Sequence, residues 1–181
     1  MDRKLLNKLI QTSIFAAFMA IASPISIPIG AIPITMSLLA VFLCGAILPP
    51  LQAFFAIFVF IFLGAVGLPV FSGYEGGIGV IVGVKGGFIL SYPIMVLVIS
   101  YVIKIFKKRN VLSLVCGMIP ALIICHSLGT LWYCRLTGIG FAEGIKLCSL
   151  PFIVPDLLKI AVAISIVVGL NKTDFFRKIR H

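Results

Sequence analysis

The chain has 181 residues, of which 61% are hydrophobic and only 11% are charged. Its mean hydropathy of +1.25 excludes an ordinary water-soluble globular domain and indicates a single polytopic membrane domain over residues 1–181. The net charge of +10 comes mainly from three short clusters, so it gives no support to nucleic-acid binding, which needs one continuous basic face.

The first apolar block has no charged side chain from residue 9 to residue 74, and prolines divide it at positions 24, 28, 33, 49 and 50. These breaks predict three membrane-spanning helices, at about 9–23, 34–48 and 51–68. No convincing small-residue cleavage site follows the first run. We therefore interpret it as a span and not as a removable signal region.

A glycine-rich stretch from Leu68 to Gly87 follows this block. Seven of its twenty residues are glycine, and its charged residues are Glu75 and Lys85. Glycine lets the backbone turn sharply and approach a ligand closely, which a lipid-facing helix cannot do. The stretch therefore predicts a cap over a binding cavity, although each of its two charges could equally be a solvated surface charge.

Three further apolar stretches, at about 86–103, 111–134 and 149–170, each have roughly the 20 residues that a spanning helix needs. Six helices place the basic clusters after zero, four and six crossings, all on one face, whereas two spans in the first block would put the middle cluster outside. The positive-inside rule thus predicts an all-α protein with six transmembrane helices, structured external loops and cytoplasmic termini. The clusters are Arg3/Lys4/Lys8, Lys104/Lys107/Lys108/Arg109 and Lys172/Arg177/Lys178/Arg180.

Two ionisable residues fall inside the last apolar stretch. Asp156 lies near its outer end and Lys159 lies three positions later, so the two share one helix face. Ionisable groups inside a span are costly and usually face a wet cavity, which makes the pair a candidate binding site. The structural alternative is that Asp156 stabilises the helix N-terminus and Lys159 pairs with it or extends toward the interface.

Other chemically capable residues give weaker signals. The five cysteines form no C-x-x-C pair, so no metal site or disulfide framework is indicated. His126, in the fifth span, is either a proton-relay group or, more commonly for such a residue, an interhelical hydrogen-bonding group. No Ser/His/Asp, metal-spaced or paired-carboxylate arrangement converges on one face, and no ATP-binding loop occurs. We expect neither an enzyme nor a cofactor.

Small residues line one face of the first predicted span. Ala16 and Ala20 are four positions apart, with Ser13 and Ala17 beside them. Such a face lets a neighbouring backbone come close. Taken alone, the pattern favours packing within the chain, and docking of another protein is the alternative.

Several segments together resemble the BioY family. They are P-I-G-A-I-P-I-T at Pro28–Thr35, G-A-V-G-L-P-V-F-S-G at Gly64–Gly73, G-G-I-G-V from Gly76, K-G-G-F from Lys85 and P-D-L-L-K at Pro155–Lys159. BioY proteins are the membrane-embedded S components, which bind biotin, of energy-coupling-factor (ECF) transporters. The resemblance extends over essentially all six spans.

The resemblance implies a six-helix S-component fold with a biotin pocket near the external face, closed by the first and third interhelical loops. It implies a multi-pass protein of a prokaryotic plasma membrane, whose partners are one transmembrane coupling protein and two ATPases. Ala16 and Ala20 match the family's Ala-x-x-x-Ala docking surface on helix one, which reverses the preference for internal packing. High-affinity capture of biotin would then precede uptake driven by the partners.

The resemblance also suggests roles for individual residues. Lys159, assisted by Lys85, is assigned to the biotin carboxylate and Asp156 to a ureido N–H, although pocket orientation could exchange the last two roles. The loop residues expected to close over the ring are Phe71, Ser72, Gly73 and Tyr74, with Glu75 reaching either the ureido group or solvent.

The chain departs from the family pattern at two places. Val84-Lys85 stands where the family commonly has Pro-Thr, and Tyr74-Glu75 stands where small residues are common. An added cation at position 85 suits an anionic ligand. The alternatives to a biotin S component are an S component for another vitamin and a stand-alone secondary transporter, but the chain has no second glycine-broken span and no paired acidic residues for coupling ions.

Overall fold

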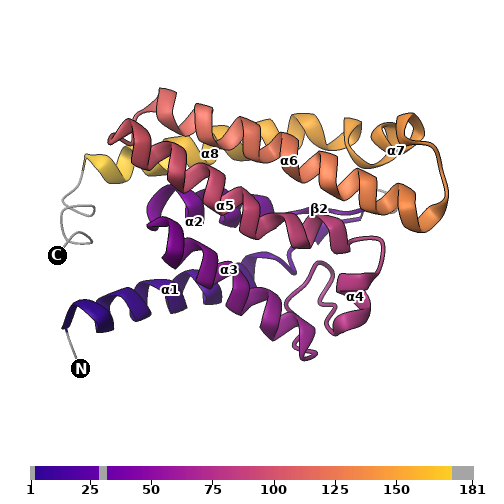
Figure 1. Ribbon diagram of the computed structural model, residues 1–181, viewed down its shortest axis with the longest axis horizontal. Helices are drawn as coiled ribbons and strands as arrows, with labels where there is room; N and C mark the ends of the chain where they lie inside the picture. Colours follow the sequence, from indigo (N-terminus) through magenta and orange to yellow (C-terminus); the bar gives the residue numbers. More distant parts are fainter. Residues whose placement is uncertain (1–2, 29–31, 173–181) are drawn as a thin grey trace.

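The computed structural model describes residues 3–28 and 32–172. Helices dominate the described residues (Figure 1). They are α1 (Arg3–Ala22), α2 (Ser37–Ile47), α3 (Pro50–Ala65), α4 (Ile78–Val82), α5 (Gly86–Phe106), α6 (Val111–Thr137), α7 (Phe141–Cys148), the 3-10 turn η1 (Leu150–Phe152) and α8 (Ile153–Asn171). Strands β1 (Ser26–Ile27) and β2 (Ile34–Thr35) pair antiparallel, with Ser26 opposite Thr35.

Each of the six predicted spans coincides with one helix, and the bounds differ by a few residues. Four helical stretches are long and apolar enough to cross a membrane: Arg3–Ala22, Gly86–Phe106, Val111–Thr137 and Phe141–Asn171. Helices α2 and α3 are apolar but shorter. Ten of the eleven residues of α2 are buried, so its uninterrupted hydrophobicity reflects a place in the protein core more than contact with lipid.

Local sequence explains where the helices begin and end. Pro49 and Pro50 separate α2 from α3, because proline fits the first turn of a helix but cannot continue one. The Asn110 side chain accepts a hydrogen bond from the Ser113 amide at 3.0 Å and caps the start of α6. Gly138, with a φ of 75°, ends α6 in the left-handed conformation.

Helix α5 occupies the centre of the molecule and packs against α2, α3 and α6 (Figure 1). Its inward face carries Met95, Val96 and Ile99, all fully buried. The backbone of α2 approaches this face closely, since a Cβ on Gly45 would lie 3.0 Å from the Ile99 Cβ and 3.1 Å from the Val96 Cα. Close packing around α5 makes the centre of the bundle rigid, and this rigid centre fixes the positions of the helix ends.

The two ends of the bundle differ in chemistry. Helices α4 and α7 lie at one end, and the start of α1 and the end of α8 lie at the other (Figure 1). Basic residues of α1, α5 and the α5–α6 link line a common groove at this second end. Three residues of the third basic cluster, Arg177, Lys178 and Arg180, and the centre of the Pro28–Thr35 motif, residues 29–31, lie outside the described residues.

Candidate ligand-binding site

A cavity opens among the helix ends on the side of α4 and α7. Its wall is built from the end of α1, β2, the start of α2, the glycine-rich link, α5, α6, α7, η1 and α8. Most of the lining is apolar or aromatic, and charged side chains are few. The lining residues are Ser23, Ile32, Pro33, Thr35, Ser37, Leu38, Phe71, Ser72, Lys85, Phe88, Ile89, Tyr92, Cys125, His126, Cys148, Phe152, Asp156 and Lys159.

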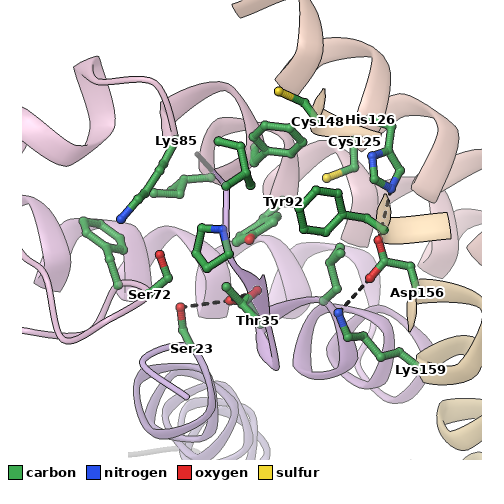
Figure 2. A pocket seen from close by; sticks show the side chains of 18 residues that line it. Ser23, Thr35, Ser72, Lys85, Tyr92, Cys125, His126, Cys148, Asp156 and Lys159 are labelled. Carbon is green, nitrogen blue, oxygen red and sulfur yellow. Dashed lines mark hydrogen bonds and ion pairs between the residues drawn. The ribbon is translucent and has the colours of Figure 1, made fainter. Parts of the chain in front are cut away.

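A buried polar cluster forms one end of this cavity (Figure 2). The Lys159 Nζ donates to the Asp156 Oδ1 at 2.7 Å, and the His126 Nε2 lies 3.0 Å from the Asp156 Oδ2. Asp156 is 0% exposed and Lys159 is 8% exposed. Each carboxylate oxygen therefore has a nitrogen partner, which offsets much of the cost of burying the charge.

The position of each group in the cluster follows from its helix. Asp156 lies in the first turn of α8, just after Pro155, and Lys159 follows it by three residues on the same face. His126 lies in the middle of α6 and reaches the carboxylate from across the cavity wall. Sequence inspection identified the Asp156–Lys159 pair from its spacing. It did not find the histidine contact, because 30 positions separate His126 from Asp156 and no local pattern joins them.

The hydrogen-bond roles of the histidine follow from the carboxylate. An ionised Asp156 can only accept, so the nearby Nε2 of His126 must carry the proton. The other ring nitrogen, Nδ1, is buried and has no hydrogen-bond partner among the described residues. In a neutral imidazole this atom would be an acceptor, in a ring that lines the cavity.

Aromatic rings form the walls next to this cluster. Phe88 lies edge-on to the His126 ring with the ring centroids 6.3 Å apart, and the Phe152 ring lies at 6.4 Å from it in a tilted orientation. Phe71, which is 1% exposed, packs edge-on against Phe60 of α3 at 5.6 Å. Flat aromatic walls with few polar groups suit a ligand that has a rigid apolar ring and a small polar edge.

The glycine-rich link covers the opposite end. Glu75 accepts a hydrogen bond from the Lys85 Nζ at 2.7 Å, and Lys85 is the one of the two that lines the cavity. Gly73 and Tyr74 have positive φ angles of 74° and 61°, and they turn the backbone so that the Phe71 amide meets the Glu75 carbonyl at 2.9 Å. Figure 2 shows Lys85 and Ser72 far from the Asp156 cluster, with Tyr92 and Thr35 between.

Five of the eight predicted ligand-binding residues line the cavity: Phe71, Ser72, Lys85, Asp156 and Lys159. Gly73, Tyr74 and Glu75 are not among the lining residues. Tyr74 is 70% exposed, and Glu75 reaches the cavity only through Lys85. Gly73 and Tyr74 shape the link, and Glu75 holds Lys85. Sequence spacing alone does not distinguish such supporting residues from residues that contact the ligand.

The first interhelical link contributes a wall that sequence patterns did not identify in detail. The β1–β2 ribbon brings Ile32, Pro33 and Thr35 to the cavity. The Ser37 hydroxyl lies within hydrogen-bond distance of the Ser23 hydroxyl, at 3.0 Å, and of the Thr35 hydroxyl, at 2.9 Å, which ties the ribbon to the end of α1. Two-residue strands are too short to carry a periodicity that predicts them.

The proposed docking residues lie outside the cavity, on α1. Ala16 is 2% exposed and Ala20 is half-buried, while the adjacent Ser13 and Ala17 are exposed. The row of small residues therefore lies along the edge between the part of α1 that packs on the bundle and the part that faces outward. Within the described part of the chain, no three His, Cys, Asp or Glu side chains come together to hold a metal ion.

Comparison with known proteins identifies the relatives of this chain. The family model described as "BioY family" matches residues 1–174. A probable biotin transporter BioY of Pyrococcus horikoshii is 36% identical over 154 residues, which cover 85% of this chain and 90% of the relative. The biotin transporter BioY2 of Lactococcus lactis is 35% identical over 144 residues, covering 80% and 79%. A crystal structure at 2.1 Å of the S component for biotin from an ECF-type ABC transporter superposes with a TM-score of 0.88 over 99% of this chain and 98% of the other, at 24% identity.

Proposed function

The chain belongs to the BioY family, and we propose that it captures biotin at the external face of a prokaryotic membrane as the S component of an ECF transporter. Family membership makes the chain a transporter component and not an enzyme. The observation that carries the choice of ligand is the cavity, which has a buried donor–acceptor cluster at one end, a cation at the other and aromatic walls between.

The chemistry of biotin matches this arrangement. Its ureido group offers two N–H donors and one carbonyl acceptor, and its carboxylate is joined to the ring by an apolar chain. Because Asp156 and Lys159 are 2.7 Å apart, they serve the same end of a ligand. A ureido group needs a donor and acceptors together, which supports placing it at the Asp156–Lys159–His126 cluster.

This orientation changes one role in the first assignment from sequence: Lys159 moves from the carboxylate to the ureido group, while Asp156 and Lys85 keep their roles. Lys159 would donate to the ureido carbonyl. His126, through its unpaired Nδ1, and Asp156 are the candidate acceptors for the ureido N–H groups. Lys85, at the other end of the cavity, would then bind the carboxylate in place of Glu75. A charge-assisted pair of this kind is about twice as strong as a neutral hydrogen bond.

Uptake would depend on partner proteins. We propose that a transmembrane coupling protein docks along the small-residue face of α1, with Ala20 and the adjacent exposed Ala17 at the contact and Ala16 supporting it from the core side. Two ATPases would supply the energy. The flat edge of α1 allows a partner helix to approach closely, as small residues do at helix interfaces in membranes.

Equilibrium binding of biotin to the purified, detergent-solubilised chain tests the proposal. Wild-type protein should bind tightly, and Asp156→Asn and Lys159→Gln should each weaken binding by roughly ten-fold or more, because each leaves a buried polar partner unpaired. Lys146→Gln, an exposed change in α7, is the matched control and should bind as wild type. A folded wild-type sample that ignores biotin but binds another vitamin would reject biotin as the ligand and keep the S-component assignment.

A further inference from the structure

A second cavity of about 800 Å³ lies at the end of the bundle away from the biotin pocket. It is enclosed by the first half of α1, the α2–α3 turn, the end of α5 and the α5–α6 link, and it shares no lining residue with the biotin pocket. Six of its lining residues are basic: Lys4, Lys8, Lys104, Lys107, Lys108 and Arg109. The positive-inside rule explains why such residues lie at this end, but it does not require them to surround one cavity.

The electrostatics of this basic groove favour an anion. Among the described residues its lining includes no aspartate or glutamate, so the basic side chains give the space they enclose a positive potential. Arg109 cannot swing away, because its Nε donates to the Ala46 carbonyl at 2.9 Å and its Nη2 to the Ile47 carbonyl at 3.2 Å. These bonds fix the guanidinium at the carboxyl end of α2 and keep one positive charge permanently at the edge of the groove.

One uncharged side chain in the groove, that of Gln52, gives a second indication of which ligand the groove binds. Gln52, near the start of α3, lines the cavity, and its side-chain Oε1 is buried without a hydrogen-bond partner among the described residues. An unpaired buried acceptor is costly. A phosphate alone cannot satisfy it, because a phosphodiester has no proton to donate. A ligand that joins a phosphodiester to a hydroxyl group would satisfy the cations and Gln52 together.

The surroundings of the groove indicate a lipid. Exposed apolar side chains lie further along both flanking helices, with Ile14 of α1 exposed by 59% and Phe55 of α3 by 47%. Acyl chains could follow these surfaces while the headgroup stays among the lysines. We propose that the basic groove binds one anionic phospholipid whose headgroup carries a hydroxyl, of the phosphatidylglycerol type. This site is independent of the biotin pocket.

Native mass spectrometry of the full chain tests the proposal after incubation with equal amounts of phosphatidylglycerol, phosphatidylethanol and phosphatidylcholine. We expect retention in that order, with phosphatidylcholine lowest. The double variant Lys8→Gln/Lys104→Gln should reduce retention of both anionic lipids by about ten-fold or more, whereas Lys146→Gln, at the other end, should not. Biotin binding at the wild-type level shows that each variant is folded. Equal retention of phosphatidylcholine and phosphatidylglycerol would overturn the proposal.

Two further arms identify the source of the anion and the role of the glutamine. Free glycerol 3-phosphate should displace the lipid only weakly; displacement as effective as that by added phosphatidylglycerol would overturn the lipid in favour of a soluble phosphate. Gln52→Leu should abolish the preference for phosphatidylglycerol over phosphatidylethanol, which has no headgroup donor, and an unchanged preference would overturn the hydroxyl-bearing headgroup. If the double variant keeps its lipid but fails to copurify with the coupling protein, the groove belongs to an acidic protein segment and the lipid proposal is overturned.

Discussion

At the scale of single residues, the binding pocket depends on how one buried carboxylate is shared. Asp156 is 0% exposed and holds Lys159 on one oxygen and His126 on the other. This sharing holds both nitrogen partners beside the cavity, and in a neutral His126 ring the proton on Nε2 points to Asp156 and Nδ1 is left as the acceptor. The carboxylate therefore acts on the ligand partly through its two partners.

His126→Gln separates these two functions of the histidine. The new amide nitrogen can take the place of Nε2 and still donate to Asp156, but no acceptor remains where Nδ1 was. We expect biotin affinity to fall by roughly 2- to 10-fold, the value of one hydrogen bond, with little change in melting temperature. His126→Ala is the matched control, because it also leaves Asp156 short of a partner and should lower the melting temperature too. Wild-type affinity in His126→Gln would show that Nδ1 makes no hydrogen bond to biotin.

Lys85→Gln tests which end of biotin lies under the glycine-rich link. Wild-type protein should prefer biotin over its uncharged methyl ester, because Lys85 forms a charge-assisted hydrogen bond with the carboxylate. In Lys85→Gln we expect this preference to shrink by about 10-fold or more, while Lys159→Gln should weaken both ligands and keep the preference. Isothermal titration with the two ligands measures it. Loss of the preference in Lys159→Gln alone would reverse the orientation.

At the scale of elements, the link over the pocket is positioned by close contact with α3. Phe71 lies against Gly64, where a Cβ would come within 2.1 Å of the Phe71 ring, and the Gly77 amide donates to the Gly64 carbonyl at 2.7 Å. Because Gly64 has no side chain, the Phe71 ring can pack against the backbone of α3 there and close the cavity.

Gly64→Ala should displace the Phe71 ring from its packing position against α3. Over-packing of this kind costs about 1–3 kcal/mol, and because Phe71 lines the pocket we expect weaker biotin binding together with a lower melting temperature. Gly79→Ala in α4 is the matched control, since a Cβ there meets nothing within 4 Å. Thermal unfolding with and without biotin measures both effects. If the two variants behave alike, the contact between Gly64 and Phe71 does not position the link.

The elements differ in how well the sequence predicts them. The apolar runs between prolines located all six main helices, because length and hydropathy are properties of a segment alone. The β1–β2 ribbon and α4 were not predicted, since elements of two and five residues have too little periodicity. Asp156 and Lys159 were found through their spacing. The interhelical hydrogen bond favoured for His126 is confirmed, but its partner Asp156 was not predicted, because only the packing of α6 against α8 brings the two together.

At the scale of the whole molecule, the two cavities divide the bundle into ends of different charge. The proposed biotin pocket contains the Asp156–Lys159–His126 cluster and the glycine-rich link, and the basic groove at the other end is lined by six basic residues. Charge segregation of this kind orients a protein in a membrane. The proposed ligand pocket thus lies at one end of the bundle, and the start of α1 and the end of α8 lie at the other (Figure 1).

Membrane orientation can be read by labelling single cysteines in a background without the five native ones. Lys146→Cys in α7 and Lys108→Cys in the α5–α6 link introduce exposed thiols at opposite ends of the bundle. If the pocket opens outward, an impermeant maleimide should label Lys146→Cys in intact cells and Lys108→Cys only after permeabilisation, because the basic end stays in the cytoplasm. Biotin uptake by both variants controls for correct insertion. The reverse labelling pattern would place the pocket on the cytoplasmic side, where it could not capture external biotin. It would contradict the predicted cytoplasmic location of the basic clusters.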